Sequence, residues 1–287
     1  EGRLIGRAFF DYYYYTGTYA FDNAGGTPAV LINRDAQINR TLGGELRLHA
    51  IPAGPHRLML GVEGRAPSRT RQAVWDEEPY FSYLEDRCGP ASWAASAQDE
   101  ARLGAHASVS AGLRYDEYES FGGTLSPRLA LISGLPRSAT LKLLYGSAFR
   151  APSPYELYYS DGNATQKSGD DLDPERVSTW EAVLELPLRR DLRLSSSVYR
   201  YDVRDLVSLI LDPADGLLVY RNSDRIRAGG FEVEVTGHVA PRVHLRASYA
   251  HQHAVDAVTD ARLTNSPADV AQLALRGQFR EVPERLF

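Results

Sequence analysis

The chain has 287 residues, of which 43% are hydrophobic and 24% are charged, and its formal net charge is −5. This balance excludes a basic nucleic-acid-binding protein, because no surplus of Lys and Arg is present to neutralise phosphates, and the ordinary apolar fraction excludes a disordered chain. No apolar run reaches the roughly 18 residues of a membrane-spanning helix. The single cysteine, Cys88, excludes an intrachain disulfide framework and a cysteine-based zinc site.

Two further features of the composition are unusual. Tyrosine is abundant, with 17 residues against 9 Phe and 3 Trp. The chain starts at Glu1 inside a strand-like pattern with no signal peptide, and its one methionine, Met59, is internal. We therefore expect the sequence to be a fragment of a longer protein.

Apolar and polar residues alternate with a period of two along most of the chain, which indicates strands rather than helices. Clear examples lie in 45–49, 57–63, 109–116, 140–145, 179–186, 231–236, 243–249 and 272–279. The pattern predicts about 12 strands, joined alternately by short and long connections.

The short connections lie near 52–55, 104–106, 135–138, 188–191 and 240–242. The long connections lie near 20–34, 67–96, 150–176, 209–217 and 256–263, with a short exception at 120–123. Tight turns at one end and long loops at the other are typical of an outer-membrane β-barrel. We therefore predict an all-β fold, an antiparallel up-and-down transmembrane β-barrel present in part, as a single domain over 1–287.

A soluble β-sandwich, propeller or lectin-like β protein is the alternative fold. Strand length favours the barrel, because 36–51 and 191–207 exceed the five to six residues or so of a typical strand, and a tilted strand needs roughly 9–11 residues to cross a bilayer. Charges opposite the apolar face also favour it, since a water-filled lumen accepts charges that a packed interior excludes. The residues expected to line that lumen are Glu181, Glu185, Glu232, Glu234, Arg246, Lys142 and Arg114.

Tyrosines gather toward the long-loop ends of the predicted strands, beginning with the run from Tyr12 to Tyr15. An aromatic belt at the membrane interface explains them, because the ring stays in an apolar layer while the hydroxyl reaches water. The alternative is that tyrosine is a good strand former in any β protein.

Several short patches follow one another in a fixed order along residues 95–280. The central patch is Tyr-Gly-Ser-Ala-Phe-Arg-Ala-Pro-Ser over 145–153, followed by Tyr155-Glu-Leu157, Leu172-Asp-Pro-Glu175 and Trp180-Glu181. Further patches are Gln98-Asp-Glu100 with Gly112-Leu-Arg-Tyr-Asp116, Tyr220-Arg-Asn222 with Gly229-Gly-Phe-Glu-Val-Glu234, and Ala247-Ser-Tyr-Ala250 with Asn265-Ser-Pro267. Together and in this order, the patches resemble the barrel of TonB-dependent outer-membrane receptors, whereas residues 1–94 carry only the strand pattern.

The resemblance implies a 22-stranded barrel filled by an N-terminal plug, which the inner-membrane TonB complex pulls. The sequence contains neither a plug, nor an energy-coupling segment, nor a closing strand, and 281–287 resembles a turn, so we expect about 12 of those strands. The resemblance also implies a monomer in contact with outer-membrane lipid in a Gram-negative type of cell. Its role would be energy-coupled uptake of a scarce large ligand, most often an iron–siderophore or similar metal chelate, with no cofactor and no enzymatic activity.

Two long connections hold the candidate ligand-binding residues. In the loop after the 145–153 patch, an arginine is a candidate anion contact and tyrosines are candidate stacking platforms; these residues are Arg150, Tyr155, Glu156, Tyr158 and Tyr159. The alternative is that prolines fix an extended loop exit and the tyrosines belong to the belt. The acidic, aromatic loop near 66–98 contributes Trp75, Tyr80 and Phe81, with a solvated lid as its alternative.

Motifs for metal binding and catalysis are weak. The aspartates of one loop, Asp161, Asp170, Asp171 and Asp173, lack the calcium-loop pattern and indicate a polar surface. His251 and His253 share a strand face without a third ligand, and Cys88 is expected to be a free loop thiol, so we predict no metal site.

The sequence has no nucleophile elbow, phosphate loop, His-Glu-x-x-His motif or dinucleotide fingerprint. Two alternative functions stay open: a passive porin-like channel, and an outer-membrane hydrolase barrel with His, Asp or Ser at its rim.

Overall fold

A computed structural model describes residues 2–51, 54–87, 89–169 and 171–277 of the chain. The expectations for Cys88, for Asp170 and for the turn at 281–287 lie outside the described residues. The first elements in chain order are β1 (Gly2–Asp22), β2 (Val30–Ala50), β3 (His56–Asp76), β4 (Phe81–Asp86), β5 (Ser92–Leu103), β6 (Ala107–Tyr118) and β7 (Gly122–Gly134). A short 3-10 helix, η1 (Pro136–Ser138), then precedes β8 (Thr140–Arg150), α1 (Pro154–Tyr158), β9 (Glu175–Arg189), β10 (Leu192–Leu211), β11 (Leu218–Ala240), β12 (Val243–Asp256) and β13 (Asp269–Gly277).

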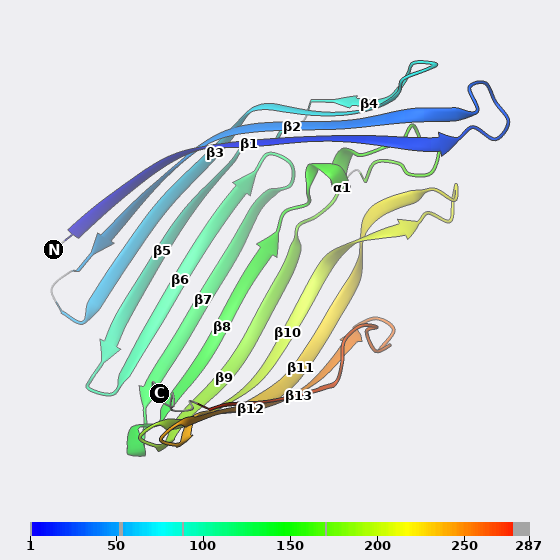
Figure 1. Ribbon diagram of the computed structural model, residues 1–287. Coiled ribbons are helices and arrows are strands. Elements are labelled where there is room, and N and C mark those ends of the chain that lie inside the picture. The colour runs from blue at the N-terminus through cyan, green and yellow to red at the C-terminus, as the bar shows by residue number, and fades with distance from the viewer. Residues whose placement is uncertain (1, 52–53, 88, 170, 278–287) are drawn as a thin grey trace, which may run out of the picture.

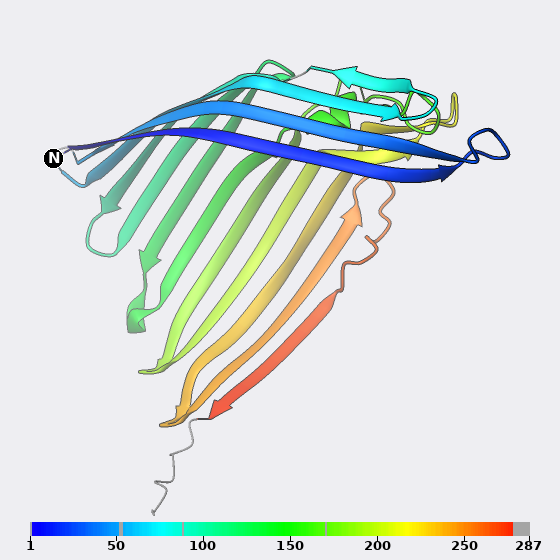
Figure 2. The ribbon, with the colours of Figure 1, turned by 45° about the horizontal axis from the view of Figure 1, so that its top comes forward.

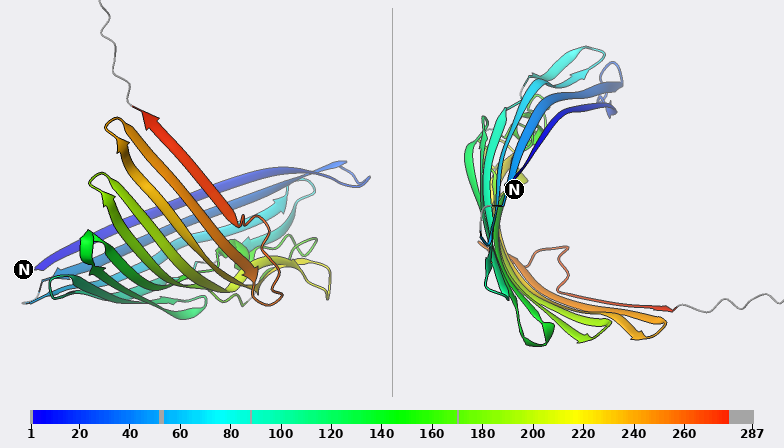
Figure 3. Two further views of the ribbon diagram at one scale, coloured as in Figure 1. Left: turned by 90° about the horizontal axis from the view of Figure 1, so that it is seen from below. Right: turned by 90° about the vertical axis from the view of Figure 1, so that its left-hand side faces the viewer.

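All 13 strands belong to one antiparallel sheet in which sequence neighbours lie side by side, in the order β1-β2-β3-β5 and onward to β13 (Figure 1). The short strand β4 pairs only with β3. The sheet curves to one side into an open trough, with β1–β4 in one arm and β12–β13 in the other (Figure 3). The edges β1 and β13 lie apart and are not paired with each other in the described part of the chain (Figure 2). This confirms the predicted all-β, antiparallel, partial barrel.

The strands run further than the sequence pattern indicates. The β1–β2 ladder continues without interruption from Gly2↔Ala50 to Asp22↔Val30, so the connection expected over 20–34 shrinks to 23–29. Likewise, the region 67–96 contains the end of β3 and all of β4. The physical reason is that cross-strand pairing satisfies backbone N–H and C=O groups in lipid and in water alike, so polar sequence does not end the ladder.

Short turns and long connections occupy opposite ends of the sheet. At one end, which we call the turn end, the links include 104–106, 190–191 and 241–242. At the other, which we call the mouth end, the links include 23–29, 151–174, 212–217 and 257–268. Gly104 has φ +70° and Gly122 has φ +82°, left-handed conformations that glycine adopts without steric cost at such turns. No helix in the described part of the chain is long and apolar enough to span a membrane.

Candidate functional site

The register of the sheet divides each strand into two faces, because alternate side chains point oppositely and directly paired residues share a face. One row of paired residues crosses β2, β3, β5 and β6 as Glu45, Glu63, Ala94 and Asp116. The adjacent row, which points the other way, is Leu46, Val62, Ala95 and Tyr115. The first row lies on the concave side, which we call the inward face; the second lies on the convex, outward face.

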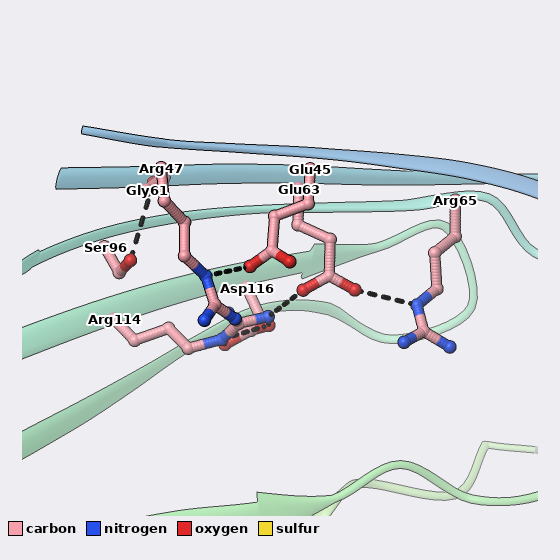
Figure 4. A network of polar contacts seen from close by, with 8 residues as sticks. All are labelled: Glu45, Arg47, Gly61, Glu63, Arg65, Ser96, Arg114 and Asp116. Carbon is pink, nitrogen blue, oxygen red and sulfur yellow. Dashed lines mark hydrogen bonds and ion pairs between the residues drawn. The ribbon is translucent and has the colours of Figure 1, made fainter. Parts of the chain in front are cut away.

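The inward face carries ion pairs on β2, β3 and β6, and one group of them links β3 to β6 (Figure 4). Arg114 of β6 donates to Asp116 at 2.7 Å and reaches Glu63 of β3 at 3.4 Å, although β5 lies between them. Glu63 also pairs with Arg65 at 2.9 Å, and on β2 Arg47 pairs with Glu45. Sequence analysis identified Arg114 but missed the acids that hold it.

The other six residues predicted to line a lumen share this face by register. Lys142 pairs with Glu185 at 2.7 Å, and Arg246 pairs with Glu234 at 2.8 Å. Glu181 pairs in register with Tyr199, and Glu232 with Ser197, on the same side of the sheet. The seven residues therefore form one polar surface.

The outward face presents an apolar band. Its exposed large side chains include Leu4, Phe10, Leu42, Leu46, Leu48, Leu58, Leu60, Val62, Leu113, Leu125, Leu129, Leu131, Leu143, Val198, Leu273 and Leu275. Toward the mouth end the band gives way to aromatic side chains, which we call the belt: Tyr12, Tyr14, Trp93, Tyr115, Tyr145, Trp180 and Tyr249. Other tyrosines expected in such a belt, including Tyr13, Tyr15, Tyr19 and Tyr199, alternate to the inward face.

At the mouth end, the β8–β9 connection is anchored by Arg150. The guanidinium donates to Glu175 at 2.6 and 2.7 Å and to Glu156 at 2.9 and 3.0 Å. Glu156 also accepts from the backbone N–H of Ser153, whose hydroxyl accepts from the N–H of Glu156, which closes a capping box on α1. The bonds with Glu175 and then Glu156 raise the pKa of Arg150, and the bond from Arg150 lowers the pKa of Glu175. Arg150 thus positions the loop, and its expected role as an anion contact for a ligand stays a prediction.

Further bonds hold the same connection against the β10–β11 connection. Lys167 donates to Asp212 and to Asp215, each at 2.7 Å. The Asn222 side chain exchanges two hydrogen bonds with the backbone of Asp173, both 2.9 Å long. The two mouth-end connections therefore form one tied unit.

Tyrosines from three distant segments gather beside this unit. Tyr155 stacks on Tyr159 with ring centroids 4.4 Å apart and meets the Tyr220 ring edge-on at 6.1 Å. On β1, the hydroxyls of Tyr15 and Tyr19 lie 2.5 Å apart. We call these five residues the tyrosine cluster. Sequence analysis selected Tyr155 and Tyr159 but not Tyr15, Tyr19 and Tyr220. The alternation of side chains along β1, which places Tyr15 and Tyr19 on the inward face, would have indicated those two.

Asp35 of β2 lies near tyrosines of the cluster from both β1 and the β8–β9 connection. Its carboxylate acts electrostatically on Tyr15, Tyr155 and Tyr159, and burial raises the pKa of Asp35 itself. Burial also raises the pKa of Tyr159 to about 12, so its hydroxyl is neutral and can donate a hydrogen bond at physiological pH. The cluster offers aromatic faces, neutral hydroxyls and one carboxylate.

The remaining candidates lie on the β3–β4 hairpin. Tyr80 and Phe81 are 69% and 57% exposed, and Trp75 pairs with Ser82 in the hairpin ladder. Phe81 packs edge-on against Tyr83, with centroids 4.8 Å apart. Tyr83, which sequence analysis did not select, donates to Asp76 at 2.5 Å, and Asp161 of the β8–β9 connection acts on it electrostatically.

The acidic loop and the paired histidines have structural partners. Asp161 accepts from Thr165 and from backbone N–H groups of 164–166; burial opposes these bonds, but together they lower the pKa of Asp161. His251 and His253 point outward, and His251 bonds to Asp269 at 2.8 Å. Within the described ranges, no three His, Cys, Asp or Glu side chains are placed to hold a metal ion.

An open antiparallel meander, apolar outside and charged inside, is part of the wall of a membrane β-barrel. The family described as TonB dependent receptor-like, beta-barrel, matches residues 3–282. The chain belongs to this family, which confirms the resemblance seen in the sequence patches and the expectation of a receptor component rather than an enzyme.

Solved structures of similar fold include a mutant of the ferric enterobactin receptor PfeA from Pseudomonas aeruginosa, at 18% identity and a TM-score of 0.73, covering 96% of this chain and 45% of that one. The copper transporter OprC is similar at 16% identity and a TM-score of 0.72, covering 96% and 47%. The siderophore receptor PirA from Pseudomonas aeruginosa is similar at 18% identity and a TM-score of 0.61, covering 88% and 51%. The chain spans about half the length of each. No curated protein sequence matches it.

Proposed function

We propose that residues 1–287 form part of the barrel of an outer-membrane receptor that takes up a scarce, large ligand with energy from the TonB complex. The observation that carries this proposal is the division of the wall into an apolar outward face and a charged inward face. Lipid outside and water inside are the environments that such faces require. Membership of the TonB-dependent receptor family supports the coupling partner, the outer-membrane location and a monomeric assembly.

For the ligand, we propose a metal chelate of the iron–siderophore class. The tyrosine cluster supports this choice, because aromatic faces and neutral hydroxyls suit a planar organic chelator. The similar solved structures include siderophore and ferric enterobactin receptors. On this proposal Tyr155 and Tyr159 contact the ligand, Arg150 and Glu156 hold them in place, and Trp75, Tyr80 and Phe81 form an outer rim.

Uptake in the cells that carry the gene tests this function. The gene is deleted, and uptake of radioactive iron is measured for a panel of ferric chelates, with and without a protonophore. We expect the deletion to lower uptake of at least one chelate about tenfold. In wild-type cells, the protonophore should abolish uptake of that same chelate. Unchanged chelate uptake, with loss of small-solute diffusion that the protonophore does not affect, would instead support the porin-like channel.

Matched tyrosine variants locate the binding surface. Replacing both Tyr155 and Tyr159 by Ala removes a stacked pair, so we expect chelate affinity to fall about tenfold, given roughly 0.5–1.5 kcal/mol per aromatic contact. Tyr14→Ala, an exposed outward tyrosine, is the control and should leave affinity unchanged. Equal losses in the two variants would count against a ligand site at the tyrosine cluster.

A further inference from the structure

Two groups of arginines lie on the outward face toward the mouth end. The first, which we call the β10 patch, is Arg176, Arg200, Arg204 and Arg227 with Arg225, which bonds to the outward Asp202. The second, which we call the β3 patch, is Arg40, Arg69 and Arg71 with Arg87, which lines the same hollow as Arg69 and Arg71. The two patches lie on opposite arms of the trough. Each gathers its arginines independently of the other.

Each patch begins at the aromatic belt. Arg200 pairs directly in register with Trp180, and Arg40 pairs directly with Tyr12, whose ring lies 5.5 Å from its guanidinium carbon. From there the β10 patch extends four residues along the strand to Arg204, roughly 13 Å at the rise of a β-strand. Both patches therefore occupy the layer just beyond the apolar band.

The positive charge of these patches is not balanced within the described part of the chain. Arg176 stands directly opposite Arg204, and Arg40 directly opposite Arg69, although like charges in such pairs destabilise a sheet. Asp202 bonds to Arg204 at 2.8 Å and Arg225 at 3.0 Å, and Glu85 lies 3.3 Å from Arg71. Six arginines of the two patches have no carboxylate of a described residue within 4 Å: Arg176, Arg200, Arg227, Arg40, Arg69 and Arg87.

The inward face has a different arrangement, because no inward arginine of the described ladders stands directly opposite another arginine. Arg47, Arg65, Arg114 and Arg246 each pair with a glutamate or aspartate on the same face. Arg128 and Arg193 also lie inward without a carboxylate of a described residue within 4 Å, but they stand opposite uncharged residues. In the described ladders, directly opposed arginines occur only on the outward face. An external anion fits such a pair, because charge-assisted bonds to a bound oxyanion offset the repulsion between opposed arginines.

The β3 patch also has the shape for an oxyanion. A hollow of about 440 Å³ opens where β3 parts from the chain after β4, lined by Ser68, Arg69, Thr70, Arg71 and Arg87. Guanidinium groups match phosphate oxygens with two parallel hydrogen bonds. The hydroxyls of Ser68 and Thr70 already donate to the Arg40 carbonyl and to Asn39, so the arginines supply the contacts to an oxyanion.

We propose that the β10 and β3 patches bind the phosphate groups of an anionic glycolipid in the outer leaflet of the membrane. The belt and band hold the acyl chains, and the arginines hold the phosphorylated headgroups directly above them. This inference rests on the membrane placement within the proposed function but not on transport, so loss of lipid binding and loss of uptake are separate results.

Lipid retention by the full-length protein, purified in detergent, tests the proposal. The protein is incubated with diphosphorylated lipid A or with the same lipid stripped of phosphate, and bound lipid is counted by native mass spectrometry. The triple variant Arg176→Gln, Arg200→Gln and Arg227→Gln removes three unneutralised arginines. We expect it to retain about tenfold less diphosphorylated lipid, since each lost charge-assisted bond weakens binding severalfold. Wild-type protein should prefer the diphosphorylated lipid by a similar factor.

The matched control carries the same three changes on the inward face, at Arg128, Arg193 and Arg246, and should retain lipid within twofold or so of wild type. The proposal would be overturned if the outward triple variant retained as much diphosphorylated lipid as wild type. It would also be overturned if wild type retained lipid without phosphate equally well. Displacement of all bound lipid by millimolar inorganic phosphate, with phosphate bound in its place, would also overturn the proposal. That result would identify a site for soluble anions. If the triple variant does not fold, Arg200→Gln and Arg227→Gln are tested singly, with Arg→Lys variants expected to retain most of the lipid.

Discussion

The two faces of the wall are built from the same strands, yet they follow different rules. Leu143 and Leu144 are neighbours on β8 with the same side chain. Leu143 pairs with Leu131 and Ala182 in the outward band, whereas Leu144 pairs with Ala130 and Glu181 on the inward face. Alternate positions of a strand point to opposite faces. The face to which a side chain points, and not the residue type alone, therefore decides which substitutions the position accepts.

The largest expected effect comes from a charge at these two neighbouring positions. Leu143→Arg places a guanidinium in the apolar band, which costs about 2–4 kcal/mol near the middle of a bilayer. Leu144→Arg places the same group among inward polar side chains, where we expect a change below about 1 kcal/mol. Denaturant unfolding of the full-length protein in lipid vesicles measures both. Equal destabilisation by the two variants would remove the distinction between the faces.

A smaller effect is expected at the mouth end. Arg150→Gln leaves Glu156 and Glu175 close together without their shared cation. Because the Arg150 side chain is 44% exposed, water screens the loss, and we expect about 1–2 kcal/mol of local destabilisation. Hydrogen exchange should then accelerate over 151–174 but not in β6. Arg200→Gln, an outward arginine without a carboxylate partner, serves as the control, and acceleration in that variant too would point to a global effect.

The same anchor predicts a dependence on pH. Arg150 lowers the pKa of Glu175, and it also lowers that of Glu156 against the opposing effect of burial, in both cases from an ordinary value of 4.5. Carboxylates with lowered pKa values stabilise the folded state above the unfolded pKa and lose that contribution as pH falls through the folded pKa. Exchange protection over 151–174, corrected for intrinsic rates, should be constant from about pH 7 to 5 and fall below about pH 4. A loss centred near neutral pH would exclude this anchor as its cause.

The smallest effect is expected on the inward face. Glu234→Gln breaks the ion pair with Arg246, whose side chain is 62% exposed. Exposed pairs contribute little, so the free energy of unfolding should change by less than about 1 kcal/mol. A loss several times larger would mean that the inward face is dry rather than water-filled.

Much of the fold follows from the sequence because period-two alternation is a local signal. The repeated alternation around 109–116 and 179–186 predicts strands and their inward charges without knowledge of partners. The extent of β1 and β2 could not be predicted, since pairing across 21 residues depends on the partner strand rather than on apolar content. The strand β4 was hidden for the same reason, inside a segment that reads as a loop.

The candidate site was predictable only in part. Tyr155 and Tyr159 are close in sequence, and their loop composition drew attention to them. Tyr15 and Asp35 reach the same place only because the trough curves, which brings the β1–β2 arm toward the β8–β9 connection (Figure 1). The role of Arg150 depended on Glu175, which lies 25 residues further along the chain.

The alternation of the two faces in the membrane is the claim on which the proposed function depends most directly. Spin labels placed one at a time at positions 141 to 146 of the full-length protein, with Cys88 replaced by Ser, measure it in lipid vesicles. We expect labels at 141, 143 and 145 to collide mainly with lipid-soluble oxygen, and labels at 142, 144 and 146 mainly with a water-soluble nickel chelate. Six labels with the same accessibility, or the reverse alternation, would contradict a wall with lipid outside and water inside.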